Sequence, residues 1–156
     1  TGALISQSAV ERMEEIVADA ISKGAKVLCG GKRPEGKRGF YFLPTILTDV
    51  TPDMQAVNEE IFGPIMSIIP YETEEEAITG ANDTQYGLAS YVWSTDYCEV
   101  ARIVKGLQFG VVNVNGPGTG PNYPHGGWKD SGIGADGSCY SLDEYFCKKG
   151  VRVALR

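Results

Sequence analysis

The sequence has little of what a metal centre or a disulfide scaffold needs. It contains one histidine, His125, and four cysteines, Cys29, Cys98, Cys139 and Cys147. No two cysteines form a C-x-x-C pair, whereas structural zinc sites use closely spaced ligand pairs. Disulfide scaffolds are shorter chains with more cysteine. We therefore predict four reduced thiols and no metal site.

Basic residues and long apolar runs are also scarce. The sequence has 14 Lys and Arg residues and 20 Asp and Glu residues, so the net charge is −6. Nucleic-acid binding usually needs a clustered basic surface, so that partner is not expected. Apolar runs such as residues 65–70 are far shorter than the roughly 20 residues of a membrane-spanning helix. No basic and then apolar leader opens the sequence, and we expect a cytoplasmic protein with no membrane partner.

Glycine, by contrast, is abundant: 20 of 156 residues, about 13% where ~7% is usual. Eight glycines and three prolines lie in residues 116–137, and a loop of that length is usually functional in a compact domain. Residues 132–137 match G-x-G-x-x-G, but no strand is expected directly before them. A dinucleotide fingerprint needs a strand before it, a helix after it and an acidic residue further on. We therefore favour a turn over a phosphate-binding loop.

Hydrophobic spacing predicts helices that alternate with strands. A capping box at Ser8–Glu11 is expected to open a first helix that ends at Gly24, and later helices are expected from Thr73 and Asp96. Strands are expected at residues 26–29, 40–50, 66–71, 89–93, 111–115 and 151–155. Pro44 indicates an edge position or an irregular strand. The alternation is typical of βαβ units and of a parallel sheet buried on both faces.

Residues 59–64 read Glu-Glu-Ile-Phe-Gly-Pro and form the most specific short segment. A carboxylate here could accept two hydrogen bonds from a vicinal diol such as a ribose, and Phe62 could pack on a flat heterocycle. The alternative is a solvated helix end that Phe62 anchors to the core. Composition alone favours that alternative.

Six motifs occur in order along the chain. They are Pro44-Thr45, residues 59–64, Asn82 with Tyr86-Gly-Leu88, Gly-Val-Val-Asn-Val-Asn at residues 110–115, Pro-His-Gly-Gly-Trp-Lys-Asp-Ser-Gly at residues 124–132, and Leu-Asp-Glu-Tyr at residues 142–145. Together they closely resemble the C-terminal part of the aldehyde dehydrogenase superfamily. The resemblance implies an α/β fold, the three-layer parallel-sheet catalytic domain of the aldehyde dehydrogenase fold, present as a C-terminal fragment. Residues 1–143 would belong to that domain and residues 144–156 to an oligomerisation strand and tail, so the full-length enzyme would form a homo-dimer or homo-tetramer.

The resemblance also implies a cofactor, NAD or NADP, and a reaction. Glu60 would bind the hydroxyls of the nicotinamide ribose, and Phe62 would pack beside the nicotinamide. The family oxidises an aldehyde to a carboxylic acid through a cysteine thiohemiacetal and thioester. Its nucleophile lies in a Gly-Gln-x-Cys setting that none of the four cysteines has. The nucleophilic cysteine and the general-base glutamate would lie upstream of Thr1, so this chain alone is expected to be inactive.

For the aldehyde substrate, the resemblance indicates an entrance lined by Asn115, Tyr123 and His125. Many family members have an aromatic residue where this chain has His125, and an imidazole argues against a strictly apolar entrance. Tyr123 and Trp128 are equally consistent with packing in the wall. Residues 131–137 resemble lactaldehyde dehydrogenases and residues 124–128 resemble amino-aldehyde enzymes, so the substrate stays open. The competing hypothesis is a free-standing, non-catalytic module that binds a nucleotide or assembles.

Overall fold

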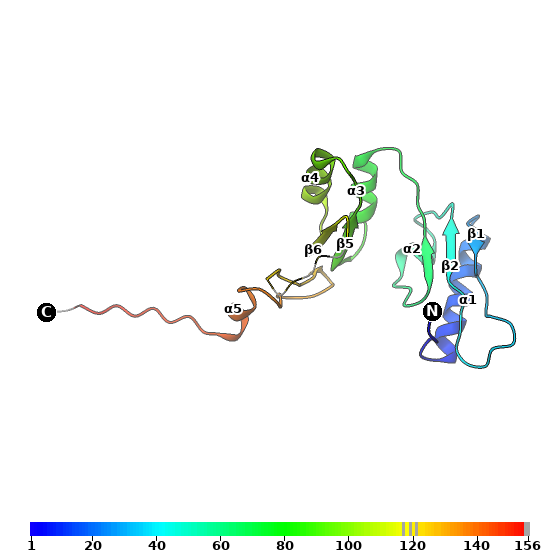
Figure 1. Ribbon diagram of the computed structural model, residues 1–156, viewed down its shortest axis with the longest axis horizontal. Helices are drawn as coiled ribbons and strands as arrows, with labels where there is room; N and C mark the ends of the chain where they lie inside the picture. Colours follow the sequence, from blue (N-terminus) through cyan, green and yellow to red (C-terminus); the bar gives the residue numbers. More distant parts are fainter. Residues whose placement is uncertain (117, 119, 121, 155–156) are drawn as a thin grey trace. The chain divides into compact units, whose positions relative to one another are not determined.

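The computed structural model describes residues 1–154 except 117, 119 and 121, and the chain forms two compact units. The first unit is Thr1–Tyr71 and the second is Glu72–Arg156. Figure 1 shows that each unit contains its own helices and strands. The chain therefore has two local folds, although its length alone suggested one domain.

The first unit packs one long helix against a small sheet (Figure 1). Its elements are α1 (Gln7–Ser22), β1 (Lys26–Cys29), β2 (Thr45–Thr48), α2 (Gln55–Asn58) and β3 (Ile65–Ser67). In the order β1-β2-β3, β1 pairs with β2 antiparallel and β2 pairs with β3 parallel. The sheet is thus mixed, and residues 59–64 form the connection from α2 into β3.

A single apolar core holds this unit together. One face of α1 is fully buried because apolar side chains recur at helical spacing. They meet β2 and the segments on either side of it. The core consists of Val10, Met13, Ile16, Val17, Ala20, Ala25, Phe42, Leu47, Val50, Met54 and Ala56. Residues 59–64, which connect α2 to β3, therefore lie next to a well-packed apolar core.

The start of α1 differs from the predicted capping box. Ser6 is the N-cap, and its Oγ accepts a hydrogen bond from the Ala9 amide at 3.1 Å. Glu11 instead accepts a hydrogen bond from the Gln7 side chain at 2.8 Å. The box at Ser8–Glu11 is wrong because an earlier serine caps the helix two residues sooner. The predicted end is confirmed, since Gly24 adopts a φ of +102°.

Of the two alternatives for Pro44, an edge position or an irregular strand, the edge position is wrong. Strand β2 is the central strand, and it begins at Thr45, directly after the proline. Pro44 therefore removes no donor from the ladder, while the Thr45 amide donates to the Pro64 carbonyl at 2.8 Å. Gly30 lies so close that an added Cβ would stand 2.1 Å from the Pro44 carbonyl oxygen. Expected strands 40–50 and 66–71 are correspondingly shorter in the structure.

The second unit contains one parallel βαβ unit and a short antiparallel pair. Its elements are α3 (Glu74–Asn82), β4 (Tyr86–Gly87), β5 (Ala89–Val92), α4 (Tyr97–Gly106), β6 (Val111–Val114), β7 (Trp128–Lys129) and α5 (Ser141–Tyr145). Strands β5 and β6 pair in parallel, joined through α4, and β4 pairs with β7 antiparallel. Figure 1 shows α3 and α4 beside β5 and β6. The predicted βαβ unit is confirmed.

Both predicted helix starts in this unit are also confirmed. The Thr73 side chain accepts a hydrogen bond from the Glu76 amide at 3.1 Å and caps α3. The Asp96 carboxylate accepts hydrogen bonds from the amides of Cys98 and Glu99, at 2.8 and 3.3 Å, and caps α4. Short polar side chains at these positions satisfy amides that have no partner within the helix.

The prediction of parallel strands is confirmed for two pairs, β2–β3 and β5–β6, whereas β1–β2 and β4–β7 are antiparallel. Within the described residues the strands form three separate sheets. On β5, Tyr91 is 61% exposed, and Trp93 beyond it is 71% exposed. Residues 151–154 form no strand within this one chain and expose Val151 and Val153, so the expected strand at residues 151–155, which would pair with a second subunit, stays a prediction. Leu155 lies outside the described residues.

Acid should weaken the first unit through carboxylates that the fold stabilises in their charged form. The guanidinium of Arg33 binds both Glu14 oxygens at 2.7 and 2.8 Å and lowers the pKa of Glu14. A hydrogen bond from the Gln55 amide, followed by one from Lys23, lowers the pKa of Asp19. A lowered pKa gives stability that is present above the ordinary value and is lost as the pH falls through the folded value.

We therefore expect Glu14→Gln to lower the thermal unfolding midpoint at neutral pH. The difference from wild type should shrink to nothing once the pH is well below the ordinary glutamate pKa of about 4.3. Thermal unfolding followed by circular dichroism at a series of pH values measures this. A difference that stays constant down to acid pH would contradict the ion pair as its source.

Candidate cofactor and substrate site

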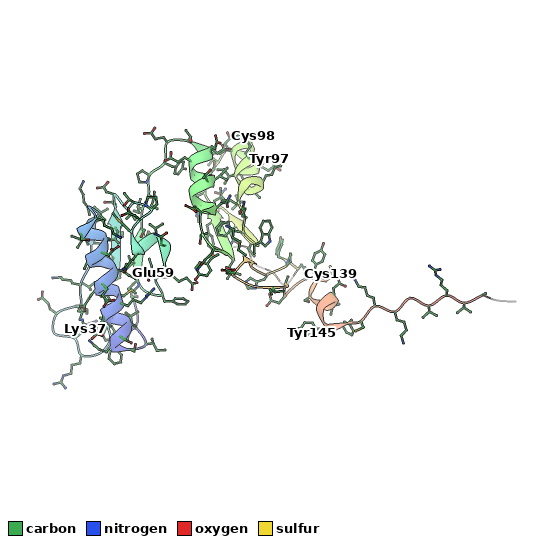
Figure 2. The ribbon with its side chains drawn as sticks, turned by 180° about the vertical axis from the view of Figure 1, so that it is seen from behind. Lys37, Glu59, Tyr97, Cys98, Cys139 and Tyr145 are labelled. Carbon is green, nitrogen blue, oxygen red and sulfur yellow. The ribbon has the colours of Figure 1, made fainter. Side chains whose placement is uncertain are left out.

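The two adjacent glutamates of residues 59–64 have different surroundings. Glu59 follows the last residue of α2 and is labelled in Figure 2. Its carboxylate forms a 3.0 Å ion pair with Arg12 of α1. The same guanidinium donates to the backbone carbonyl of Glu60 at 2.9 Å. The Glu60 side chain is exposed, and its carboxylate has no hydrogen bond to the described residues. Arg12 thus binds the Glu59 side chain and the Glu60 backbone, and it leaves the Glu60 carboxylate available.

Phe62 combines exposure with an unusual backbone conformation. Its side chain is 83% exposed, so it does not anchor a helix end to the core. Its φ is +47°, a left-handed value that is rare for a bulky residue. Such conformations cost about 1–3 kcal/mol and cluster at ligand-binding sites. Both observations argue against the solvated-anchor interpretation of the sequence.

The turn that follows Phe62 is pressed against the core of the first unit. A Cβ added to Gly63 would lie 2.1 Å from the Met13 sulfur, so this position has no room for a side chain. Met13 is 1% exposed and belongs to the core. Residues 59–64 are therefore held at two points, by Arg12 on the polar side and by Met13 on the apolar side. A carboxylate and a ring on a fixed backbone are what a flat, hydroxyl-bearing ligand requires.

In the second unit, a pocket of about 680 Å³ lies between β6 and the segment that follows it. Its described lining consists of Gly110, Val111, Val112, Asn113, Val114, Asn115, Gly116, Gly118, Gly120, Tyr123, Pro124 and His125. The three residues predicted to contact the aldehyde, Asn115, Tyr123 and His125, are thus brought to one pocket. Glu60 and Phe62 belong to the other unit.

His125 is held by Asp136 through backbone and side chain together. The two residues form an antiparallel bridge, with both backbone hydrogen bonds at 2.8 Å. His125 Nδ1 lies 2.8 Å from a carboxylate oxygen of Asp136. Both side chains are largely exposed, at 64% and 77%. The contact occupies one ring nitrogen and leaves Nε2 without a partner among the described residues.

Asn115 uses its side chain to close the end of the β5–β6 pair. Its carbonyl oxygen accepts from the Ser94 amide at 3.0 Å, and its amide donates to the Ser94 carbonyl at 2.8 Å. Its φ of +55° is one that asparagine tolerates better than most residues. The polar atoms of this amide are therefore engaged with backbone, while the residue still lines the pocket.

Comparison with known proteins decides the family. The family model described as "Aldehyde dehydrogenase family" matches residues 1–151. The chain belongs to the aldehyde dehydrogenase family. It is 47% identical over 151 residues to human mitochondrial succinate-semialdehyde dehydrogenase, and the match covers 96% of this chain and 28% of that protein. It is 44% identical over 145 residues to a non-phosphorylating aspartate-semialdehyde dehydrogenase of Halomonas elongata, and that match covers 92% of this chain and 29% of the relative.

Solved structures agree with the sequence matches. A Mycobacterium tuberculosis aldehyde dehydrogenase complexed with NAD+ superimposes with a TM-score of 0.86 at 43% identity, covering 92% of this chain and 30% of that one. An NADP-dependent enzyme of E. coli superimposes with a TM-score of 0.87 at 42% identity, and the match again covers 92% of this chain and 30% of that one. The aldehyde dehydrogenase chain therefore has the α/β fold of these enzymes. It spans a little over a quarter of the length of the curated relatives it matches.

Several glycines of this aldehyde dehydrogenase chain explain how the segment after β6 approaches the strands. A Cβ on Gly110 would stand 1.7 Å from the Gly126 carbonyl oxygen, and one on Gly126 would stand 2.4 Å from the Gly134 carbonyl oxygen. A Cβ on Gly127 would meet Ser131 at 2.5 Å. Backbone packs on backbone at these points, which only glycine permits. The glycine-rich stretch is thus a closely packed loop, and residues 132–137 within it bend at Ile133 and Gly134 and include the bridge residue Asp136.

The sequence did not reveal the roles of Arg12 and Asp136, which contact predicted site residues, or of Lys129, which binds at the end of α3. Lys129 Nζ donates to the carbonyls of Asn82 and Thr84, at 2.7 and 2.9 Å, where α3 ends. Cations favour that end of a helix. Arg12 and Lys129 lie more than 40 residues from their partners along the chain, so no local pattern could reveal these pairs.

The four cysteines are free and exposed, which confirms the prediction of unpaired thiols. Figure 2 labels Cys98 in the first turn of α4 and Cys139 shortly before α5. No group of three His, Cys, Asp or Glu within the described residues could hold a metal ion. In the same part of the chain, no helix has both the length and the apolar character needed to cross a membrane.

Proposed function

We propose that this chain is the C-terminal part of the catalytic domain of an NAD(P)-dependent enzyme that oxidises an aldehyde to a carboxylic acid. The family match over residues 1–151 carries the proposal. In the whole enzyme the strands of both units would contribute to a three-layer, parallel-sheet domain. Exposed Tyr91 and Trp93 support this, because contiguous apolar surface usually marks a contact with other protein.

The cofactor in this proposal, NAD or NADP, is held in part by Glu60 and Phe62. The free Glu60 carboxylate would accept hydrogen bonds from the two hydroxyls of the nicotinamide ribose. The exposed Phe62 ring would pack beside the nicotinamide and limit its movement. When bound, the cofactor supplies the hydride acceptor. The pairing of Glu59 with Arg12 supports the choice of Glu60 over its neighbour.

The aldehyde in this proposal enters along the pocket that Asn115, Tyr123 and His125 line. The nucleophilic cysteine and the general-base glutamate come from chain outside this sequence, since none of the four cysteines has Gly-Gln-x-Cys around it. The 156-residue chain alone would then oxidise no aldehyde. Free thiols are typical of reducing compartments and support a cytoplasmic location.

Assembly is the last part of the proposal. Residues 1–143 would form the catalytic portion, and residues 144–156 would pair with a second subunit in a homo-dimer or homo-tetramer. The extended, exposed backbone around Val151 and Val153 supports this, because unpaired strand edges tend to find partners. Deleting residues 146–156 from the full-length enzyme should lower the oligomer mass seen by light scattering. An unchanged mass would contradict the assignment.

The proposed function is tested by the full-length protein that contains this chain. Purified enzyme should produce NADH or NADPH when supplied with the oxidised cofactor and an aldehyde panel, and a carboxylic acid should accumulate in equal amount. The alternative, a non-catalytic nucleotide-binding or assembly module, predicts cofactor binding or self-association without turnover. An open reading frame that begins near Thr1 would favour that alternative.

A further inference from the structure

Asn115 is followed by Gly116, and this is the only Asn-Gly pair in the sequence. The other asparagines precede glutamate, aspartate, valine or tyrosine. The backbone nitrogen of the next residue can attack an asparagine side chain, and a glycine there has no Cβ to hinder the attack. The pair lies directly after β6, which ends at Val114. It is therefore the asparagine in this chain best suited to react with its own backbone.

The two reacting groups of this pair have different surroundings. The Gly116 amide has no hydrogen bond to the described residues, and a Cβ added to Gly116 would meet nothing within 4 Å. The Asn115 side chain, by contrast, is held at both ends by the backbone of Ser94. Its Oδ1 accepts from the Ser94 amide at 3.0 Å, and its Nδ2 donates to the Ser94 carbonyl at 2.8 Å. The attacking nitrogen is thus free, whereas the group that it would attack is clamped.

We propose that Asn115–Gly116 is a site of spontaneous deamidation, which the backbone of Ser94 slows while the end of the β5–β6 pair stays closed. The Gly116 nitrogen loses its proton to water and bonds to Cγ of Asn115, the Cγ–Nδ2 bond breaks, and ammonia leaves with a proton from the solvent. Water then opens the cyclic imide, at Cγ to give isoaspartate or aspartate according to which of its two carbonyl carbons it attacks. Attack at Cγ gives aspartate, and attack at the main-chain carbonyl gives isoaspartate. Water is the only co-reactant, and the inference does not depend on the proposed function.

Either product would break part of the contact with Ser94. In aspartate, one carboxylate oxygen still accepts from the Ser94 amide, but the other replaces Nδ2 and faces the Ser94 carbonyl oxygen, where no donor is left. In isoaspartate, the main chain runs through Cβ and Cγ, so the backbone directly after β6 is longer. Both products also add a negative charge at a residue that lines the pocket. Modification is therefore expected to loosen the end of the β5–β6 pair.

The site is tested by ageing the full-length protein at mildly alkaline pH and mapping its peptides by mass spectrometry at intervals. In the folded protein, Asn115 should convert to the acid before any other asparagine. The same protein unfolded in guanidinium chloride should convert at Asn115 about tenfold to hundredfold faster, because the two hydrogen bonds to Ser94 are lost. Gly116→Ala should slow the conversion in guanidinium chloride, where the folding of the variant does not matter, because the new Cβ hinders the attack.

The effect of the modification is tested with Asn115→Asp, which has the same side chain as one of the products. This variant of the full-length protein should unfold at a temperature about 3 °C lower than wild type, because the hydrogen bond to the Ser94 carbonyl is replaced by two facing acceptors. Asn122→Asp is the matched control. It adds the same charge at an exposed side chain that has no hydrogen bond to the described residues, and it should leave the unfolding temperature unchanged.

Three results would overturn parts of the proposal. Conversion of another asparagine ahead of Asn115 in the folded protein, or conversion of Asn115 in the unfolded protein alone, would overturn the site. Equal rates at Asn115 in the folded and unfolded protein would overturn the protection by Ser94. An Asn115→Asp variant as stable as Asn122→Asp would overturn the loosening of the β5–β6 pair. None of these results bears on aldehyde oxidation, so the proposed function is tested separately.

Discussion

Replacing Glu60 with glutamine in the full-length enzyme should raise the KM for the oxidised cofactor about tenfold, because hydrogen bonds to a charged group contribute about 1.5–3 kcal/mol. Glutamine keeps the size of the side chain and one acceptor oxygen but loses the charge. Steady-state kinetics with the cofactor varied at saturating aldehyde measure the effect. Glu60→Ala should raise the KM further, since it removes both acceptor oxygens.

The neighbouring residue provides the control for this prediction. Glu59→Gln also removes one negative charge, but the lost contact is an exposed ion pair with Arg12. Such pairs contribute about 0–1 kcal/mol, so the cofactor KM should change no more than about twofold. Unchanged cofactor kinetics in Glu60→Gln, or equal effects of the two substitutions, would contradict the assignment of the ribose contact to Glu60.

Replacing Gly110 with alanine should destabilise the second unit strongly. The new Cβ would stand 1.7 Å from a backbone carbonyl oxygen of Gly126, and backbone has no rotamer through which to move away. Overpacking of this kind costs about 1–3 kcal/mol or more. We expect a fall of about 5 °C in the thermal midpoint. Because Gly110 and Gly126 both border the pocket segment, aldehyde oxidation should fall as well.

Gly80 of α3 offers a matched substitution. A Cβ there meets nothing within 4 Å, and the residue has an ordinary helical backbone. Gly80→Ala should therefore leave the midpoint unchanged or raise it, since alanine favours a helix over glycine by about 0.5–1 kcal/mol. Differential scanning calorimetry of both variants gives the comparison. A Gly110→Ala variant as stable as Gly80→Ala would contradict the close backbone approach.

The sequence predicted the local elements better than their assembly. Caps such as Thr73 and Asp96 depend on a few neighbouring residues, and both helices begin where predicted. The first helix begins two residues earlier than predicted, because its N-cap is Ser6 and not Ser8. Parallel pairing is present in β2–β3 and β5–β6, but the antiparallel pairing of β1 and β7 was not predicted, because it depends on which strands meet in the fold.

For the candidate site, too, the sequence did not reveal the contacts between distant residues. The choice of Glu60 and Phe62 came from the family resemblance, since composition alone favoured a solvated helix end. What singles out Glu60 in the structure is the ion pair of its neighbour Glu59 with Arg12, which lies far away along the chain. The pairing of His125 with Asp136 likewise depends on a bridge that turns the glycine-rich segment back on itself. Contacts between distant residues are decided by packing and carry no local sequence signal.

The role of Glu60 is tested by cofactor binding to the full-length enzyme, measured by isothermal titration calorimetry with wild type, Glu59→Gln and Glu60→Gln. We expect NAD+ or NADP+ to bind wild type, with a Kd within about twofold of that value for Glu59→Gln and about tenfold higher for Glu60→Gln. Equal Kd values in all three proteins would contradict a nicotinamide-ribose contact by Glu60, whose carboxylate is left free by the pairing of Arg12 with Glu59.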